Sequence, residues 1–183
     1  MEESDKREVA DAYDTLGGRI YDLRYAEEQG AKYDALLKRL TPELDDIALD
    51  IGCGTGLLTE QLESQAVGLD ISASLLFAAL SRLRGRAQSH LVMGEAGALP
   101  FCDSSFNIVF SVTVLQNTPD PLASIMEMKR VGRAKAGVSA LKKAFTMKSF
   151  KMLLEEGSVE SFDILDSSGL NDWIAFIDLP PKL

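Results

Sequence analysis

The chain has 183 residues, of which 46% are hydrophobic and 26% charged, with a formal net charge of −9. This composition is typical of one globular domain with a sizeable core, and the negative charge argues against broad, nonspecific binding to nucleic acid, which needs clustered Lys and Arg. Two cysteines and one histidine exclude a disulfide framework and a histidine-rich metal centre, and no apolar run reaches the roughly 18 residues that a transmembrane helix requires. We therefore expect a single cytoplasmic domain over residues 1–183, with no membrane contact and no bound metal.

Helical character dominates the N-terminal part, residues 1–44. In the run EEQGAKYDALLKRL, the apolar residues Ala31, Ala35, Leu36 and Leu40 recur at near-helical spacing. The Thr-Pro pair that follows this run ends the helix. These apolar positions are expected to face the core.

The remaining chain, residues 45–183, alternates short apolar runs with helical segments and forms the sheet core. Strands are expected at residues 47–51, 66–71, 90–94, 106–112, 136–141, 159–165 and 172–179. Helices are expected from about Leu57, from the N-cap Ser72 to about Arg84, after the N-cap pair Asp120-Pro121, and from Thr146 to Glu156. A Ser/Gly/Asn-rich turn makes the last two strands antiparallel neighbours. The order predicts an α/β fold with a mostly parallel, doubly wound sheet, one antiparallel strand and a C-terminal hairpin.

A glycine-rich loop, DIGCGTG, follows the first predicted strand. In a doubly wound sheet, ligands bind beyond the carboxyl ends of the strands, beside the first strand, and glycines let the backbone approach them closely. A helix that starts after the loop would add free N–H groups. The glycines Gly52, Gly54 and Gly56 are spaced G-x-G-x-G, whereas the dinucleotide fingerprint G-x-G-x-x-G would need glycine at Leu57. Because Asp50 suits an ammonium group better than a pyrophosphate, we expect a ligand with an amino-acid end and a nucleoside end.

Three motifs follow one another between Ile47 and Val114: LDIGCGTG, VGLDIS and GEAGALPFCDSSFNIVFSV. In this order and spacing they resemble the class I S-adenosylmethionine-dependent methyltransferase family. The resemblance implies a seven-stranded, Rossmann-like sheet, S-adenosylmethionine as the cofactor and methyl transfer as the activity.

The resemblance implies a binding site for the methionine part of the cofactor around the glycine loop. Gly52 and Gly54 would line it through their backbone, and Asp50 would help to hold the amino group, directly or through water. Cys53 lies between these glycines and is included in the predicted site, although packing within the loop is the favoured interpretation of its side chain. Ser111, at the end of the fourth strand, would lie beside the transferred methyl group.

The adenosine part has its own predicted residues. Asp70, at the end of the second strand, would accept hydrogen bonds from both ribose hydroxyls, since a carboxylate has two oxygens. Ile71 would lie against the adenine face. Glu95, followed by the small Ala96, stands where the family commonly has Asp, and would contact the adenine edge.

The N-terminal run AYDTLGGRIYDLRYAEEQ resembles segments that fold over the cofactor as a lid in similar methyltransferases. Tyr21, Arg24 or Tyr25 could then contact the methionine carboxylate, and the Gly-Gly pair would allow the lid to move. An aromatic helix face packed on the core explains the same residues equally well.

The methyl acceptor stays open between a small metabolite and RNA or protein. Methyl transfer from a sulfonium mainly needs an aligned acceptor, so the lack of an evident acid–base pair does not argue against an enzyme. The segment SVTVLQNTPDP lacks the Asn-Pro-Pro-aromatic motif of relatives that methylate exocyclic or amide nitrogens, and Gln116 and Asn117 in it could orient an acceptor.

Two features bear on partners. From Lys129 to Lys151 the charged residues are all basic, which indicates either a solvated helix surface or a patch for RNA or another anionic substrate. Some compact relatives act on RNA or protein with a small zinc-containing activator subunit that covers one sheet edge, and the apolar run HLVM in the third strand would be that edge.

Two other functions compete with a methyltransferase. The first is a cofactor-binding scaffold subunit without catalytic activity, because intact binding motifs do not demonstrate turnover. The second is a nicotinamide oxidoreductase, which the missing third glycine disfavours.

Overall fold

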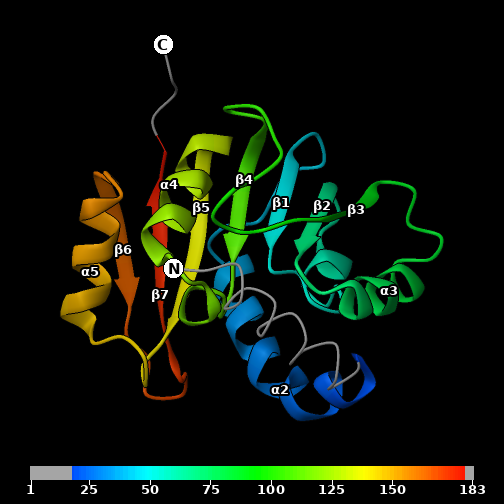
Figure 1. Cartoon of the computed structure of the whole chain (residues 1–183), viewed down its shortest axis with the longest axis horizontal. Coiled ribbons are helices and arrows are strands. Elements are labelled where there is room, and N and C mark those ends of the chain that lie inside the picture. The colour runs from blue at the N-terminus through cyan, green and yellow to red at the C-terminus, as the bar shows by residue number, and fades with distance from the viewer. Residues whose placement is uncertain (1–17, 180–183) are drawn as a thin grey trace.

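In this computed structural model, which describes the backbone of residues 18–179 and the side chains of residues 28–179, seven strands form one sheet (Figure 1). The strands are β1 (Ile47–Ile51), β2 (Gln65–Asp70), β3 (Ser89–Met93), β4 (Phe106–Ser111), β5 (Gly132–Leu141), β6 (Ser161–Leu165) and β7 (Asp172–Asp178). Their order is β3-β2-β1-β4-β5-β7-β6. β7 runs antiparallel to β5 and β6, and the other neighbouring strands pair in parallel. The predicted mostly parallel, doubly wound sheet with one antiparallel strand and a C-terminal hairpin is confirmed.

Helices precede or connect the strands, and three of them begin at side-chain caps. They are α2 (Gly18–Leu37), α3 (Ala73–Arg82), α4 (Pro121–Val131) and α5 (Met147–Glu156), with 3-10 turns η1 (Thr59–Gln61) and η2 (Leu115–Asn117). Ser72 and Asp120 accept hydrogen bonds from backbone N–H groups of α3 and α4, and Thr146 forms a capping box at the start of α5. Both predicted N-caps, Ser72 and Asp120, are confirmed, and Thr146, predicted as the start of a helix, is its N-cap.

Two apolar cores cover the two faces of the sheet. In β1, Leu49 packs into a core with residues of α4 and α5 such as Met128 and Phe150. Its neighbour Ala48 lies in the other core, with Leu36 of α2. Because successive side chains in a strand point to opposite faces, a strand covered on both faces appears as a continuous apolar run.

The structure corrects three expectations about elements. No α-helix starts near Leu57, because the loop continues through Gly56, which has a φ of +81°, and only eight residues (57–64) remain before β2; the turn η1 forms instead. β5 begins at Gly132 rather than at residue 136, since Gly132 is extended and joins α4 to the strand directly.

The third correction concerns the face of α2 that packs on the sheet. Ala31 is exposed, whereas Gln29, Lys32 and Tyr33 are buried together with Leu36. The predicted apolar pattern contained none of the first three. Gln29 and Lys32 are polar and can be buried because they find partners at the ends of β4 and β7, including an ion pair of Lys32 with Asp172.

Candidate functional site

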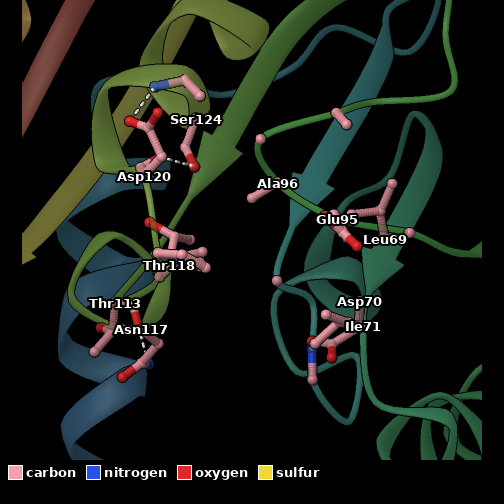
Figure 2. A pocket seen from close by; sticks show the side chains of 18 of the residues that line it. Leu69, Asp70, Ile71, Glu95, Ala96, Thr113, Asn117, Thr118, Asp120 and Ser124 are labelled. Carbon is pink, nitrogen blue, oxygen red and sulfur yellow. Dashed lines mark hydrogen bonds between the residues drawn. The ribbon is translucent and has the colours of Figure 1, made fainter. Parts of the chain in front are cut away.

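A cavity of about 510 Å³ opens at the carboxyl ends of β1, β2 and β4. Figure 2 shows its two opposing walls. The Asp70 wall consists of Leu69, Asp70, Ile71, Gly94, Glu95 and Ala96. The Asn117 wall includes Val112, Thr113, Val114, Asn117, Thr118, Asp120 and Ser124. The cavity therefore lies where a doubly wound sheet is expected to bind its ligand.

The carboxylate of Asp70 is held in place at the cavity by two backbone N–H groups. Its Oδ2 accepts a hydrogen bond of 2.8 Å from Gly54 N, and its Oδ1 accepts one of 2.9 Å from Ser72 N. The glycine loop and the N-cap of α3 thus fix the orientation of a carboxylate that is 8% exposed. A carboxylate has about four acceptor positions, so this arrangement is compatible with two ribose hydroxyls as further donors.

The glycine loop forms the floor between the walls. Gly52 and Gly54 line the cavity and have φ angles of +71° and +54°, a conformation that favours glycine. Backbone N–H groups of Gly52 and Cys53 donate to the carbonyl of Leu69, which ties the loop to the end of β2. A Cβ atom on Gly52 would lie 2.3 Å from Val114 Cγ2, so the loop also packs closely against the Asn117 wall.

Asp50 lies beneath the loop and is not among the residues that line the cavity. Its Oδ2 accepts a hydrogen bond of 2.7 Å from Thr59 Oγ1, and the residue is 2% exposed. Burial raises the pKa of Asp50 to about 7, the bond from Thr59 opposes this shift, and the charge of Asp70 adds to it. Asp50 is therefore a buried carboxyl that titrates near neutral pH.

Two further predicted residues, Cys53 and Ser111, also lie outside the lining. The Sγ of Cys53 packs against β2, where a Cβ atom on Gly68 would approach it to 2.9 Å, and burial raises the pKa of this thiol well above its usual range. Ser111 is buried at the end of β4, and the cavity is lined by the following residues, from Val112 to Val114. Glu95, Ala96 and Ile71 do line it.

Comparison with known proteins identifies the family. Residues 49–138 match the family model described as "Methyltransferase domain". A demethylmenaquinone methyltransferase of Roseiflexus sp. (strain RS-1) is 36% identical over 141 residues, which are 74% of this chain and 57% of that protein. A malonyl-[acyl-carrier protein] O-methyltransferase of Marinomonas sp. (strain MWYL1) is 34% identical over 131 residues, 69% of this chain and 48% of that protein.

Solved structures show the same fold. A chain of the complex between the Haloferax volcanii Trm112 methyltransferase activator and its methyltransferase superposes with a TM-score of 0.75 at 12% identity, covering 92% of this chain and 97% of that one. The chain belongs to the class I S-adenosylmethionine-dependent methyltransferase family. This methyltransferase chain spans about half the length of the curated relatives that it matches.

The residues of the methyltransferase site fit the cofactor of the family, S-adenosylmethionine. Asp70 presents a fixed carboxylate, the backbone of Gly54 is close to it, and Glu95 is on the same wall. Tyr21 belongs to α2, but its side chain, like those of Arg24 and Tyr25, lies outside the described residues. The roles assigned to single residues in cofactor binding remain predictions.

Sequence reasoning missed most of the Asn117 wall. It named Asn117 and Gln116, whose side-chain amides both donate to the carbonyl of Thr113, and of these two residues Asn117 lines the cavity. Thr118 and Ser124 were not singled out, although the turn NTPDP after a buried strand marks a segment at the carboxyl end of the sheet.

The basic stretch from Lys129 to Lys151 is distributed over α4, β5 and α5, so its members lie at both ends of the sheet. Arg130 is paired with Glu127 and Asp103, and Lys142 with Asp166. These pairs favour a solvated surface over a continuous anion-binding patch. Within the described part of the chain, no three His, Cys, Asp or Glu residues are grouped as metal ligands, and none of the helices has the length and apolar character to cross a membrane.

Proposed function

We propose that this chain is an enzyme that transfers a methyl group from S-adenosylmethionine to a small-molecule acceptor. The observation that carries the proposal is one cavity with two chemically different walls. The Asp70 wall presents a fixed carboxylate, and the Asn117 wall combines apolar Val112 and Val114 with the polar side chains of Asn117 and Thr118. A volume of about 510 Å³ lies in the range of small-ligand sites.

The Asp70 wall and the loop would bind the donor. Asp70 would accept hydrogen bonds from the ribose hydroxyls, Ile71 would pack against the adenine ring, and Glu95 with Ala96 would contact its edge. The backbone of Gly54 would lie along the methionine part. When bound, S-adenosylmethionine supplies an electrophilic methyl group on a sulfonium, so no metal or redox group is needed for the transfer.

The Asn117 wall would bind the acceptor. Its apolar residues suit a flat ring and exclude water, while Asn117 and Thr118 can form hydrogen bonds to an oxygen substituent. Since one relative is named a demethylmenaquinone methyltransferase, we propose the ring carbon of an aromatic hydroquinone as the first acceptor to test. Alignment of that carbon with the methyl group would provide most of the rate acceleration, as expected for a displacement whose leaving group is already present.

The test has two steps. Calorimetric titration with S-adenosylhomocysteine and with NAD should show binding of the first and no binding of the second. Incubation with methyl-labelled S-adenosylmethionine and reduced 1,4-naphthoquinone should then give a C-methylated product. Asp163→Ala, which removes an exposed carboxylate on β6, serves as the control for Asp70→Ala. Binding without turnover on any acceptor would favour the non-catalytic scaffold, and binding of NAD would favour an oxidoreductase.

A macromolecular acceptor with an activator subunit is the second candidate, favoured by the edge strand β3. Among the described strands, β3 pairs only with β2, and Met93 at its end is 68% exposed. Exposed Phe77 and Leu80 lie on α3, which packs against β3. We propose this edge as the docking site of a small zinc-containing activator of the Trm112 type, by analogy with the Haloferax volcanii complex. Co-expression with such an activator should give a stable heterodimer that Met93→Lys disrupts; a chain that stays monomeric would exclude this candidate.

A further inference from the structure

A buried cluster of polar side chains lies behind the Asn117 wall. Lys32 of α2 is fully buried, and its Nζ is 2.8 Å from Asp172 Oδ1, 2.9 Å from Thr113 Oγ1 and 3.1 Å from Glu28 Oε1. Asp172, the first residue of β7, is also fully buried. Burying such a pair costs desolvation energy that its attraction often only balances, so overall stability alone does not account for it.

The cluster converges on Thr113, which has an unusual backbone. Its φ is +61°, a left-handed conformation that is strained for a β-branched residue. Its N–H donates to Ser139 Oγ at 2.8 Å, and its hydroxyl donates to Asp172 Oδ2 at 3.0 Å. Ser139 Oγ in turn donates to the same Oδ2 at 2.7 Å. The carboxylate of Asp172, neutralised by Lys32, thus holds both the backbone and the side chain of Thr113.

The conformation of Thr113 determines the shape of the Asn117 wall. Its carbonyl oxygen accepts hydrogen bonds from the side-chain amides of Gln116 and Asn117, so the turn η2 is built on this peptide group. Val114, the next residue, packs against Gly52. The side chains of Lys32, Ser139 and Asp172 do not belong to the described lining of the cavity and therefore act on it through Thr113.

We propose that Lys32, Asp172 and Ser139 are positioning residues for the acceptor, which hold Thr113 in its strained conformation and thereby aim Asn117 into the cavity. The inference rests on the proposed function of the Asn117 wall. It assigns these residues no role at the Asp70 wall, where the Asp70 carboxylate accepts hydrogen bonds from Gly54 N and Ser72 N. Substitution of the cluster should therefore lower kcat/KM for the acceptor and leave the affinity for the cofactor nearly unchanged.

The experiment uses Lys32→Met/Asp172→Asn, which removes both charges together and leaves no unpaired buried ion. In the amide NMR spectrum with saturating S-adenosylhomocysteine, the signals of Thr113, Val114 and the Asn117 side chain should shift or broaden, whereas those of Ile71 and Glu95 stay in place. By calorimetry, the affinity for S-adenosylhomocysteine should change by less than about threefold, because the Asp70 carboxylate is held by Gly54 N and Ser72 N, which do not belong to the cluster. With reduced 1,4-naphthoquinone, kcat/KM should fall about 10–100-fold.

A rescue experiment distinguishes loss of the Thr113 conformation from general destabilisation of the double variant. Glycine adopts a positive φ without strain, so adding Thr113→Gly to the double variant should restore part of kcat/KM, whereas Thr113→Ala, which loses the same hydroxyl, should not. Arg39→Met is the matched control, because the exposed Arg39–Asp163 pair joins the end of α2 to β6 without reaching the cavity, and it should leave all readouts unchanged.

Unchanged signals of Thr113 and Asn117 in the double variant would overturn the inference, as would an equal loss of S-adenosylhomocysteine affinity. A wild-type chain that does not methylate reduced 1,4-naphthoquinone would refute that acceptor, while the NMR comparison would still decide the positioning role.

Discussion

The buried carboxyl of Asp50 predicts a stability that decreases as the pH rises towards neutrality. Burial raises its pKa from 3.8 to about 7, so between these values the folded protein retains a proton that the unfolded chain has lost. The free energy of unfolding must then fall with increasing pH and level off above the folded pKa. About two pH units separate pH 5 from that pKa, which corresponds to a loss of about 2.7 kcal/mol between pH 5 and pH 8.

Asp50→Asn tests this directly. The amide is neutral at every pH and its oxygen can still accept the hydrogen bond from Thr59, so the variant should lack this contribution to the pH dependence. Urea unfolding of both proteins at pH 5, 6, 7 and 8 isolates the contribution of Asp50, because the other titrating groups are common to both proteins and cancel when the two unfolding free energies are subtracted. The gap in unfolding free energy should change by about 2.7 kcal/mol in favour of the variant at high pH. Parallel curves for the two proteins would refute the raised pKa.

The same carboxyl provides a test of cofactor binding. If Asp50 helps to hold the amino group of the cofactor, its charged form is the competent one, so the wild type should bind S-adenosylhomocysteine more tightly at pH 8 than at pH 6. Calorimetry should show no such gain for Asp50→Asn. An equal pH dependence in both proteins would remove Asp50 from the predicted site.

Four further substitutions have defined outcomes. Asp70→Ala should weaken S-adenosylhomocysteine binding about 10–100-fold by calorimetry, since charge-assisted hydrogen bonds are lost. Gly52→Ala should cost about 1–3 kcal/mol in urea unfolding, because the new Cβ would lie 2.3 Å from a methyl group of Val114 and φ is +71°. Phe110→Ala should cost about 3–5 kcal/mol by the same measurement, since this side chain is fully buried in the core below α2. Thr146→Ala should cost about 1 kcal/mol through loss of the capping box of α5, and an unchanged midpoint would contradict the cap.

The elements that sequence reasoning predicted well are those with local signals. β1 was placed at residues 47–51, its observed bounds, because an apolar run ends there at a glycine loop. The caps at Ser72 and Asp120 were recognised because an N-cap side chain bonds to a backbone N–H group only three residues away. Asp70 was assigned to the site by the family resemblance, and the structure places it at the cavity, at the end of β2.

The expectations that differed depend on information beyond the local pattern. Apolar spacing after Leu57 is compatible with a helix, and only the positive φ angles of the loop and the start of β2 leave too little room for one. Cys53 and Ser111 are neighbours in sequence of residues that line the cavity, but they are absent from its described lining. The direction of a side chain at a strand end depends on how the backbone turns there, which spacing does not specify.

The burial of Lys32 cannot be predicted from any local sequence pattern. A lysine in an amphipathic helix is normally assigned to the solvent face, because burying its charge alone is very unfavourable. Its burial becomes comprehensible only together with Asp172 in β7, and the two residues meet because the antiparallel strand returns beside β5 at the cavity. A local reading of either residue would make it a surface charge. The residues that hold Thr113 in the Asn117 wall are thus distributed over α2, β5 and β7, whereas those of the Asp70 wall follow one another along the motifs that identify the family.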